Sequence, residues 1–416
     1  MFGLRDDEVV SKYWFTGIKT EETFTVPRNL EKKLVLNYDQ TIPEFNQRDN
    51  WKTLKGFFSS NKKLKFQFFK DAEDPYYNQI FYMPILNFNI YDGLSPGIRF
   101  TNKTLLERPF VFDLAPSYAF REKTLVGYGR LNYRHYHGKS GFYVTNYELR
   151  GSSSHFQTNS RYSTFTPSIR MGWRPADLIS NKRKQLTLRY VNVFRTIDPS
   201  LDIETDPDYS VLNARFTNSN NGIIDYFTWF IDAQYSNDFS KLAFNLEYRK
   251  LFVNNTQFNF RFFAGKFLRN ETTGDYFSFA LDRPTDYLFD YNYLGRSEDS
   301  GIWSQQLIIA EGGFKSKLEN PFSNDWIATT NSSVNIWKWV EVYGDLGFIK
   351  NKNQPTRFVY DSGIRLNLLT DYFELYFPVY SNNGWEIAQP NYAERIRFII
   401  ALSPKTLIGL FTRKWF

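Results

Sequence analysis

The sequence predicts an all-β chain: a transmembrane antiparallel β-barrel of about 14 to 16 strands behind a short N-terminal soluble segment. Long segments alternate apolar with polar side chains, as membrane-spanning strands must. Aromatic residues make up 19% of the chain, with 42 Phe and 28 Tyr, yet the mean hydropathy is −0.49. A barrel explains both values, because half of its strand residues face lipid and half face a polar lumen.

Helical membrane spans are excluded by the absence of any run of about 18 consecutive apolar residues. A membrane role therefore requires strands, whose backbone polar groups pair with each other inside the bilayer.

Residues 1–75 differ from the rest of the chain. They carry many charges and the pairs Val26-Pro27 and Ile42-Pro43, with strand-like pieces near 13–18 and 34–37. We expect the end of a periplasmic soluble domain plus a linker that stops near Asp74-Pro75. The residues after Met1 lack the basic and apolar regions of a secretory signal, so we expect the natural N-terminus to lie upstream.

Residues 76–403 carry the alternation that predicts the barrel. For example, Leu242, Phe244, Leu246 and Tyr248 alternate with Ala243, Asn245, Glu247 and Arg249. A soluble β-sandwich also alternates. Candidate strands of about 10 or more residues, the aromatic content and the near absence of helical patterns favour the membrane barrel.

Turn signals separate these strands. Asn221-Gly222 and Asn383-Gly384 predict tight turns, and Asn254-Asn255 is a weaker signal. The Tyr-, Asp- and Gly-rich stretch 269–301 is interpreted as a long extracellular loop. Ser403-Pro404 resembles a helix start, so residues 404–416 are either a short amphipathic helix or a last strand.

The net charge of +7 and the pI near 9.1 come from basic residues spread along the chain, so no nucleic-acid partner is expected. On the polar faces of predicted strands we expect lumen-facing arginines, namely Arg130, Arg134, Arg261, Arg395 and Arg397. Cysteine is absent, which excludes disulfides and thiolate chemistry.

Few residues suggest catalysis or metal binding. His135 and His137 share one strand face without an evident third ligand, and the acidic run Asp202, Glu204, Asp206 and Asp208 lacks the EF-hand spacing. Ser152, Ser153 and Ser154 precede His155, but adjacent strand residues point to opposite faces. The sequence therefore predicts no catalytic, cofactor-binding or metal-binding residue in this chain.

Several stretches resemble the C-terminal region of metallopeptidase-like proteins from Bacteroidetes that are related to the aminopeptidase N (gluzincin) family. They are residues 42–51, 91–94, 102–106, 165–168 and 189–193. The resemblance implies a zinc domain followed by an outer-membrane barrel. The family motif H-E-x-x-H is missing here, since none of the three histidines precedes Glu. Zinc is thus expected only in an N-terminal domain outside this chain, and whether the parent protein is an enzyme stays open.

Three hypotheses follow for the function of a chain in the bacterial outer membrane. The first is a membrane anchor or structural domain, with a plugged or narrow lumen, for a larger metallopeptidase-like protein. The second is a porin-like channel with an Arg-lined lumen, and the third is a barrel hydrolase. The expected partners are outer-membrane lipid and the barrel-assembly machinery, with peptide substrates only through a missing domain.

Overall fold

The computed structural model describes residues 1–27, 29–55, 62–104, 107–138, 141–200, 208–291 and 301–400. It divides into two compact units. The first comprises Met1–Ile85 and Gly97–Ala115, and the second comprises Leu86–Pro96 and Pro116–Phe416.

The first unit contains a four-stranded sheet in the order β2-β1-β3-β4. Its strands are β1 (Phe2–Arg5), β2 (Glu8–Lys12), β3 (Lys33–Val35) and β4 (Trp51–Thr53). Leu4, Val35 and Trp51 form its small core, and Tyr38 and Tyr76 pack against them. β5 (Lys63–Phe68) pairs in parallel with the start of β6 (Tyr77–Asn89). β5 thus begins before the predicted boundary at residue 75, and the division at that residue stays a prediction.

Long strands make up most of the remaining chain, as the alternation predicts. They are β7 (Gly93–Thr101), β8 (Phe110–Ala119), β9 (Thr124–Tyr136), β10 (Gly141–Gln157), β11 (Ser160–Arg174), β12 (Lys182–Thr196), β13 (Tyr209–Asn221), β14 (Asp225–Tyr235), β15 (Phe239–Leu251), β16 (Gln257–Asn270), β19 (Trp326–Trp337), β20 (Val340–Lys350), β21 (Arg357–Leu369), β22 (Phe373–Ser381) and β24 (Arg397–Ile400). Together with β6, the described residues thus include sixteen strands of four or more residues from Tyr77 onward. This number lies within the predicted range.

Short elements complete the described chain. β17 (Phe279–Ala280) pairs with β18 (Phe322–Ser323), and β23 (Gly384–Trp385) pairs with β22. The described helices are the 3₁₀ turns η1 (Ile302–Gln305), η2 (Glu386–Ala388) and η3 (Tyr392–Arg395). None of the helices in the described ranges is long and apolar enough to cross a membrane.

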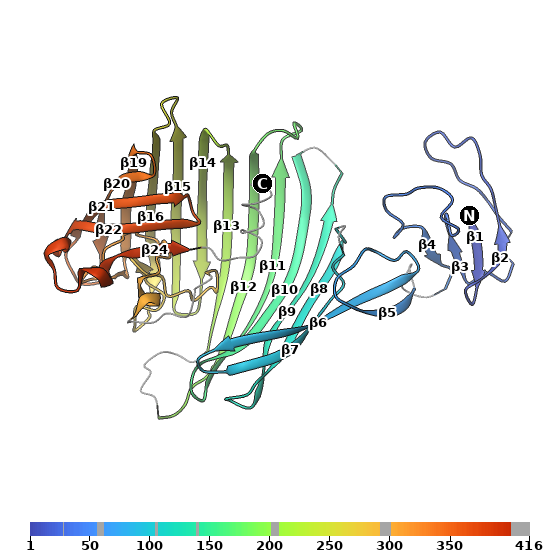
Figure 1. Ribbon diagram of the computed structural model, residues 1–416, viewed down its shortest axis with the longest axis horizontal. Coiled ribbons are helices and arrows are strands. Elements are labelled where there is room, and N and C mark those ends of the chain that lie inside the picture. Colours follow the sequence, from blue (N-terminus) through green and yellow to red (C-terminus); the bar gives the residue numbers. More distant parts are fainter. Residues whose placement is uncertain are drawn as a thin grey trace. The chain divides into compact units, whose positions relative to one another are not determined.

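In the second unit, β9 to β16 pair antiparallel in sequence order, and β19 to β22 and β24 continue the sheet (Figure 1). Across the chain the strand order is that of a closed β-barrel. The predicted turns are confirmed, since residues 222–224 join β13 to β14 and Ser381 pairs with Gly384 across a tight turn. Asn255, in the turn after β15, has a φ of 61°, the left-handed conformation that Asn tolerates.

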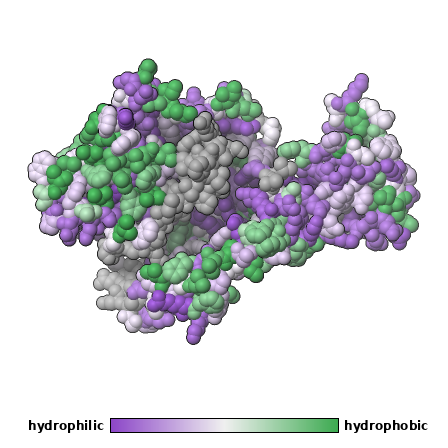
Figure 2. Space-filling model, in the orientation of Figure 1, coloured by the Kyte–Doolittle hydropathy of each residue, from purple (hydrophilic) through white to green (hydrophobic). Residues whose placement is uncertain are grey.

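The two faces of this sheet differ, which decides its environment. The outward residues are large and apolar, including Leu188, Leu212, Ile231, Leu346 and Phe348, of which Leu346 is 52% exposed. Figure 2 shows such residues gathered at the left of the view, where β19–β22 lie in Figure 1. Exposed apolar rows on strands of this length are the lipid-facing surface of a transmembrane barrel. The chain therefore has the outer-membrane barrel fold that the sequence predicts.

The long segment between β16 and β19 distinguishes the two ends of the sheet in the second unit. The short turns 222–224, 252–256, 338–339 and 370–372 lie at one end, which we call the short-turn end. The segment between β16 and β19 leaves the opposite end. We call its described residues, 271–291 and 301–325, the inner connection for the reason given below.

Candidate functional site

The inner connection packs against the inner face of the sheet. Its Phe279, Leu281, Tyr287, Leu288 and Phe314 are buried and belong to the largest apolar core of the described chain. The sheet contributes inward side chains to the same core, namely Val191, Val193, Val211, Phe239, Phe263, Ile327, Ile349 and Val359. The described residues of the predicted loop 269–301 therefore do not project from the barrel but pack against its inner face, and their extracellular location stays a prediction. Arg269 and Asn270 end β16, and residues 276–289 lie inside.

The backbone of the inner connection satisfies many of its own hydrogen bonds. β17 and β18 pair with each other, and Leu281 N–H donates to Pro321 O at 2.8 Å. Gly312 N–H donates to Ala280 O, and Phe314 N–H donates to Leu281 O. Backbone polar groups that leave water need such partners, so this segment packs as a folded element.

A buried ion pair joins the inner connection to β20. Lys315 Nζ lies 2.9 and 2.8 Å from the two carboxylate oxygens of Asp345, whose side chain is fully buried. Asp361 on β21, directly opposite Asp345 in the register, accepts the backbone N–H groups of Lys315 and Ser316 at 2.7 Å each. Two strands therefore hold the same dipeptide through charged hydrogen bonds.

Gly312 and Gly313 bring the backbone of the connection close to β16 and β19. Asn331 Nδ2 donates to Gly312 O at 3.0 Å, and Arg261 Nη1 donates to Asn331 Oδ1 at 3.0 Å. A Cβ on Gly313 would lie 2.4 Å from Asn331 Oδ1, and the residue has a φ of +74°. Glycine is thus required here both for space and for backbone conformation.

The other side of the connection is held by β12 to β14. Arg189 on β12 forms a bidentate pair with Asp290, with contacts of 2.5 and 2.7 Å. Burial opposes the charged form of Asp290, but the hydrogen bond and charge of Arg189 outweigh it and keep its pKa below the ordinary value. Tyr287 donates from its hydroxyl to Gln234 at 2.6 Å and accepts Tyr209 Oη at its carbonyl.

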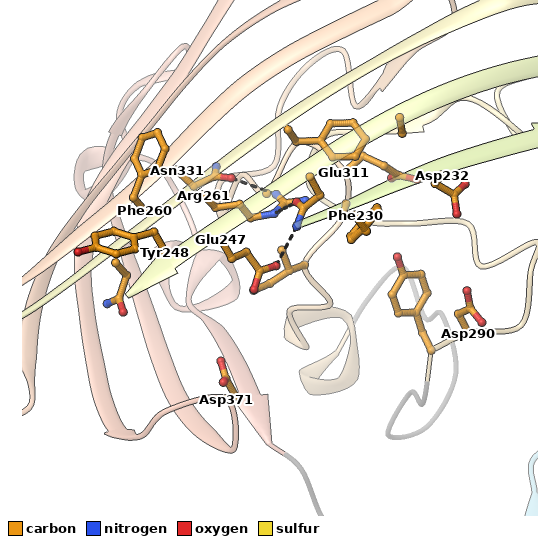
Figure 3. A pocket seen from close by; sticks show the side chains of 18 of the residues that line it. Phe230, Asp232, Glu247, Tyr248, Phe260, Arg261, Asp290, Glu311, Asn331 and Asp371 are labelled. Atoms are coloured by element: carbon orange, nitrogen blue, oxygen red, sulfur yellow. Dashed lines mark hydrogen bonds between the residues drawn. The ribbon is translucent and has the colours of Figure 1, made fainter. Parts of the chain in front are cut away.

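A cavity of about 730 Å³ remains on the inner face, between the inner connection and the short-turn end. Its lining includes Tyr226 and Arg249, which are two and three residues from a short turn, and Asp371 within one. Gly313, Lys315, Ile309 and Asp290 of the connection line its other end. Figure 3 shows Arg261, Glu247 and Asn331 on one side of this space and Asp232 and Asp290 on the other.

The lining includes 14 charged residues, and most of them are in ion pairs. Arg215 binds Asp232 at 2.7 Å, and Arg365 binds Glu374 at 2.5 Å and Glu341 at 3.0 Å. Buried charges of this kind need partners in a low-dielectric environment. These ion pairs determine which cations of the cavity stay available to a ligand.

One pair crosses between distant strands at the short-turn end. Arg249, near the end of β15, forms a bidentate pair with Asp371, in the β21–β22 turn, with both contacts at 2.7 Å. β16, β19 and β20 lie between these elements in the sheet. The guanidinium also lies 4.9 Å from the ring centroid of Tyr226. The pair therefore narrows the cavity where its lining reaches the short turns.

The arginines predicted to face the lumen occupy different places. Arg261 lines the cavity. Arg130 and Arg134 lie on the same face of the sheet as Glu148 and Asn146. Asn146 is directly opposite Arg170, which lines the cavity, so this face is the inner one. Arg397, at the start of β24, is 1% exposed and donates to Asp282 O of the inner connection. Arg395 was wrongly placed on a strand. It lies in η3 and pairs with Glu386, because the alternation was followed past the start of β24.

The candidate catalytic residues do not come together. Ser152, Ser153 and Ser154 contact Thr164, Ser163 and Tyr162 of the neighbouring strand through their hydroxyls. His155 is buried and binds Asp92, in the β6–β7 turn, through Nδ1 at 2.5 Å. The Asp92–His155 pair was not predicted, because the 63 positions that separate the two residues hide the contact in the sequence.

The metal candidates have no set of ligands around them in the described residues. His135 and His137 lie with ring centroids 4.7 Å apart, and His137 Nε2 is 2.8 Å from the hydroxyl of Thr145. No group of three or more His, Cys, Asp or Glu side chains in the described ranges is placed to hold a metal ion. Of the acidic run Asp202 to Asp208, only Asp208 is among the described residues.

Comparison with known proteins gives only structural similarity. No protein family and no curated protein matches the sequence. One similar solved structure is BamA from Haemophilus ducreyi, crystallised without POTRA domains 1–3. The match covers 73% of this chain and 66% of the BamA chain, at 13% sequence identity and a TM-score of 0.40. A second is CdiB from Acinetobacter baumannii. This match covers 71% of this chain and 55% of the CdiB chain, at 12% sequence identity and a TM-score of 0.33. Both are outer-membrane β-barrel proteins.

Proposed function

We propose that this chain is an outer-membrane anchor whose barrel is closed by its own inner connection. The packing of that connection carries the proposal. Phe314 and Leu281 are fully buried on the inner face, and Lys315 is held by Asp345 and Asp361. Barrels of 16 to 18 strands otherwise leave an aqueous channel, so a folded segment inside one reduces or blocks flow.

Ion conductance in planar bilayers tests this proposal. The complete chain is expected to pass no steady current, whereas a variant with residues 275–320 replaced by a short Gly-Ser turn is expected to conduct. Migration of folded and heated samples on gels checks that both proteins form barrels. A steady current through the unmodified chain contradicts the closed-anchor proposal.

The second candidate is a channel, and the charged cavity favours it. Arg170, Arg189 and Arg215 line the cavity of about 730 Å³, whose lining reaches the strand ends beside the short turns. The same recordings separate the two functions, because an open channel with this lining is expected to prefer anions. The reversal potential under a salt gradient measures that preference.

We further propose, on the resemblance to Bacteroidetes metallopeptidase-like proteins, that this chain is the membrane part of a larger protein. Outer-membrane lipid surrounds it and the barrel-assembly machinery inserts it, while zinc and peptide substrates belong to another domain. The test is the sequence encoded upstream of Met1. A signal peptide followed by H-E-x-x-H supports this proposal, and a signal peptide directly before Met1 overturns it without affecting the anchor role.

A further inference from the structure

We propose that the cavity at the short-turn end is a binding site for a small solute that carries two or more negative charges on phosphate or carboxylate groups. Five of the arginines on the inner surface of β9 to β13 form what we call the basic wall: Arg134, Arg150, Arg170, Arg189 and Arg215. The inference goes beyond the anchor role, because an anchor needs no ligand.

The register places three of these arginines in one row. Arg134 is opposite Asn146, which is opposite Arg170, and Arg170 and Arg215 are both opposite Thr187. Directly opposite residues point to the same face, and Arg170 and Arg215 line the cavity. Because the arginines stand on alternate strands, they recur about every 10 Å across the sheet.

Two arginines of the basic wall are in no ion pair with a described residue. Within the described ranges, Arg150 and Arg170 make no ion pair and no hydrogen bond, and Arg170 is exposed to the cavity. Guanidinium groups bind phosphate and carboxylate through two parallel hydrogen bonds. Arg170 is therefore the group we expect to contact the ligand first.

Most carboxylates of the cavity are already in ion pairs. Asp232 binds Arg215, Asp290 binds Arg189, and Asp371 binds Arg249. Glu247 and Glu311 lie near Arg261, and their charges act on its guanidinium. Glu247 accepts from Asn245 and Glu311 accepts from the Ala280 N–H, so a cationic ligand would compete with an arginine or with these donors for every carboxylate of the lining. An anionic ligand meets Arg170, which has no ion-pair partner among the described residues. The charge arrangement therefore selects an anion.

Access is expected from the short-turn end. The inner connection contributes Lys315, Gly313 and Ile309 to the opposite end of the cavity. At the short-turn end the Arg249–Asp371 pair lies beside Tyr226, with Arg249 28% and Asp371 54% exposed. Such a half-exposed pair is weak enough to rearrange when a solute enters.

Isothermal titration calorimetry on the complete chain in detergent tests the proposal, with sodium pyrophosphate and sodium citrate as separate probes. Binding is expected to weaken as salt increases. Arg170→Gln is expected to weaken it by about tenfold to a hundredfold, the value of a charged hydrogen bond. Tighter pyrophosphate binding identifies phosphate as the preferred group, and tighter citrate binding identifies carboxylate.

Arg357→Gln is the matched control. Arg357 begins β21 away from the basic wall, is exposed, and its substitution removes the same charge. It is expected to leave binding unchanged. The proposal is overturned if the unmodified chain binds neither probe, or if both variants weaken binding equally while retaining the heat-modifiable gel migration of a folded barrel.

Discussion

Replacing Lys315 by Met is expected to release the inner connection locally. The change leaves the fully buried carboxylate of Asp345 without its cation and directly opposite a second carboxylate, Asp361. Removing one partner of a buried pair costs about 3 to 5 kcal/mol. The lower value corresponds to about a 150-fold larger population of the opened connection, since 1.4 kcal/mol is a factor of ten.

Hydrogen exchange measured by mass spectrometry on the peptides of the inner connection reads this population. The double variant Lys315→Met with Asp345→Asn is expected to recover most of the protection, because a neutral amide costs less to bury than an unpaired carboxylate. Lys266→Met is the control. Lys266 pairs with Asp325 at 3.5 Å on the exposed surface, where such pairs contribute below about 1 kcal/mol. Equal, small losses of protection in Lys315→Met and Lys266→Met would refute the role of the buried pair.

Three further outcomes follow from described contacts. Gly313→Ala is expected to lower exchange protection of the inner connection by about 2 kcal/mol, whereas Gly274→Ala, with open space around it, changes nothing. Burial lowers the pKa of Lys62 to about 8, so the folded first unit binds fewer protons than the unfolded chain between about pH 8 and 10.5. The first unit is therefore expected to gain stability as the pH rises through this range. Pulse proteolysis should show this gain in the unmodified chain and not in Lys62→Met. Asp92→Asn is expected to cost about 1.5 to 3 kcal/mol of local stability, because it removes a buried charged hydrogen bond to His155. Faster hydrogen exchange in residues 86–96 measures this loss. His155→Gln is expected to give a similar loss if the pair is structural.

The strands were predictable because their signal is local. In β15, Leu242 points outward and Lys241 inward, and this period of two is visible without knowing which strand lies beside it. The same reasoning failed at Arg395, because a 3₁₀ turn with alternating residues looks like a strand extension over so short a distance. The predicted helix or strand over residues 404–416 lies outside the described residues.

The inner connection was not predictable from its composition. Tyr276, Asp286 and Asp290 are residue types typical of surface loops, and a loop that turns inward places them against Arg195, the backbone and Arg189. Nothing in the sequence states that Lys315 meets Asp345, because pairing 30 positions apart depends on the register of β19 and β20. The lumen-facing arginines were inferred from strand faces, whereas their ion-pair partners depend on tertiary contacts.

The width of the barrel interior explains the mixture of apolar and charged residues in the inner connection. The interior of a barrel with this many strands is too wide for side chains of the wall alone to fill. Apolar residues such as Phe314 and Leu281 supply the missing packing, but they cannot satisfy the polar wall beside them. Lys315 and Asp290 satisfy these polar groups, because Lys315 pairs with Asp345 on β20 and Asp290 pairs with Arg189 on β12. The connection therefore needs both apolar and charged residues. Beyond it, Arg170 faces the cavity in which we place the anion, with no ion-pair partner among the residues that the structure describes.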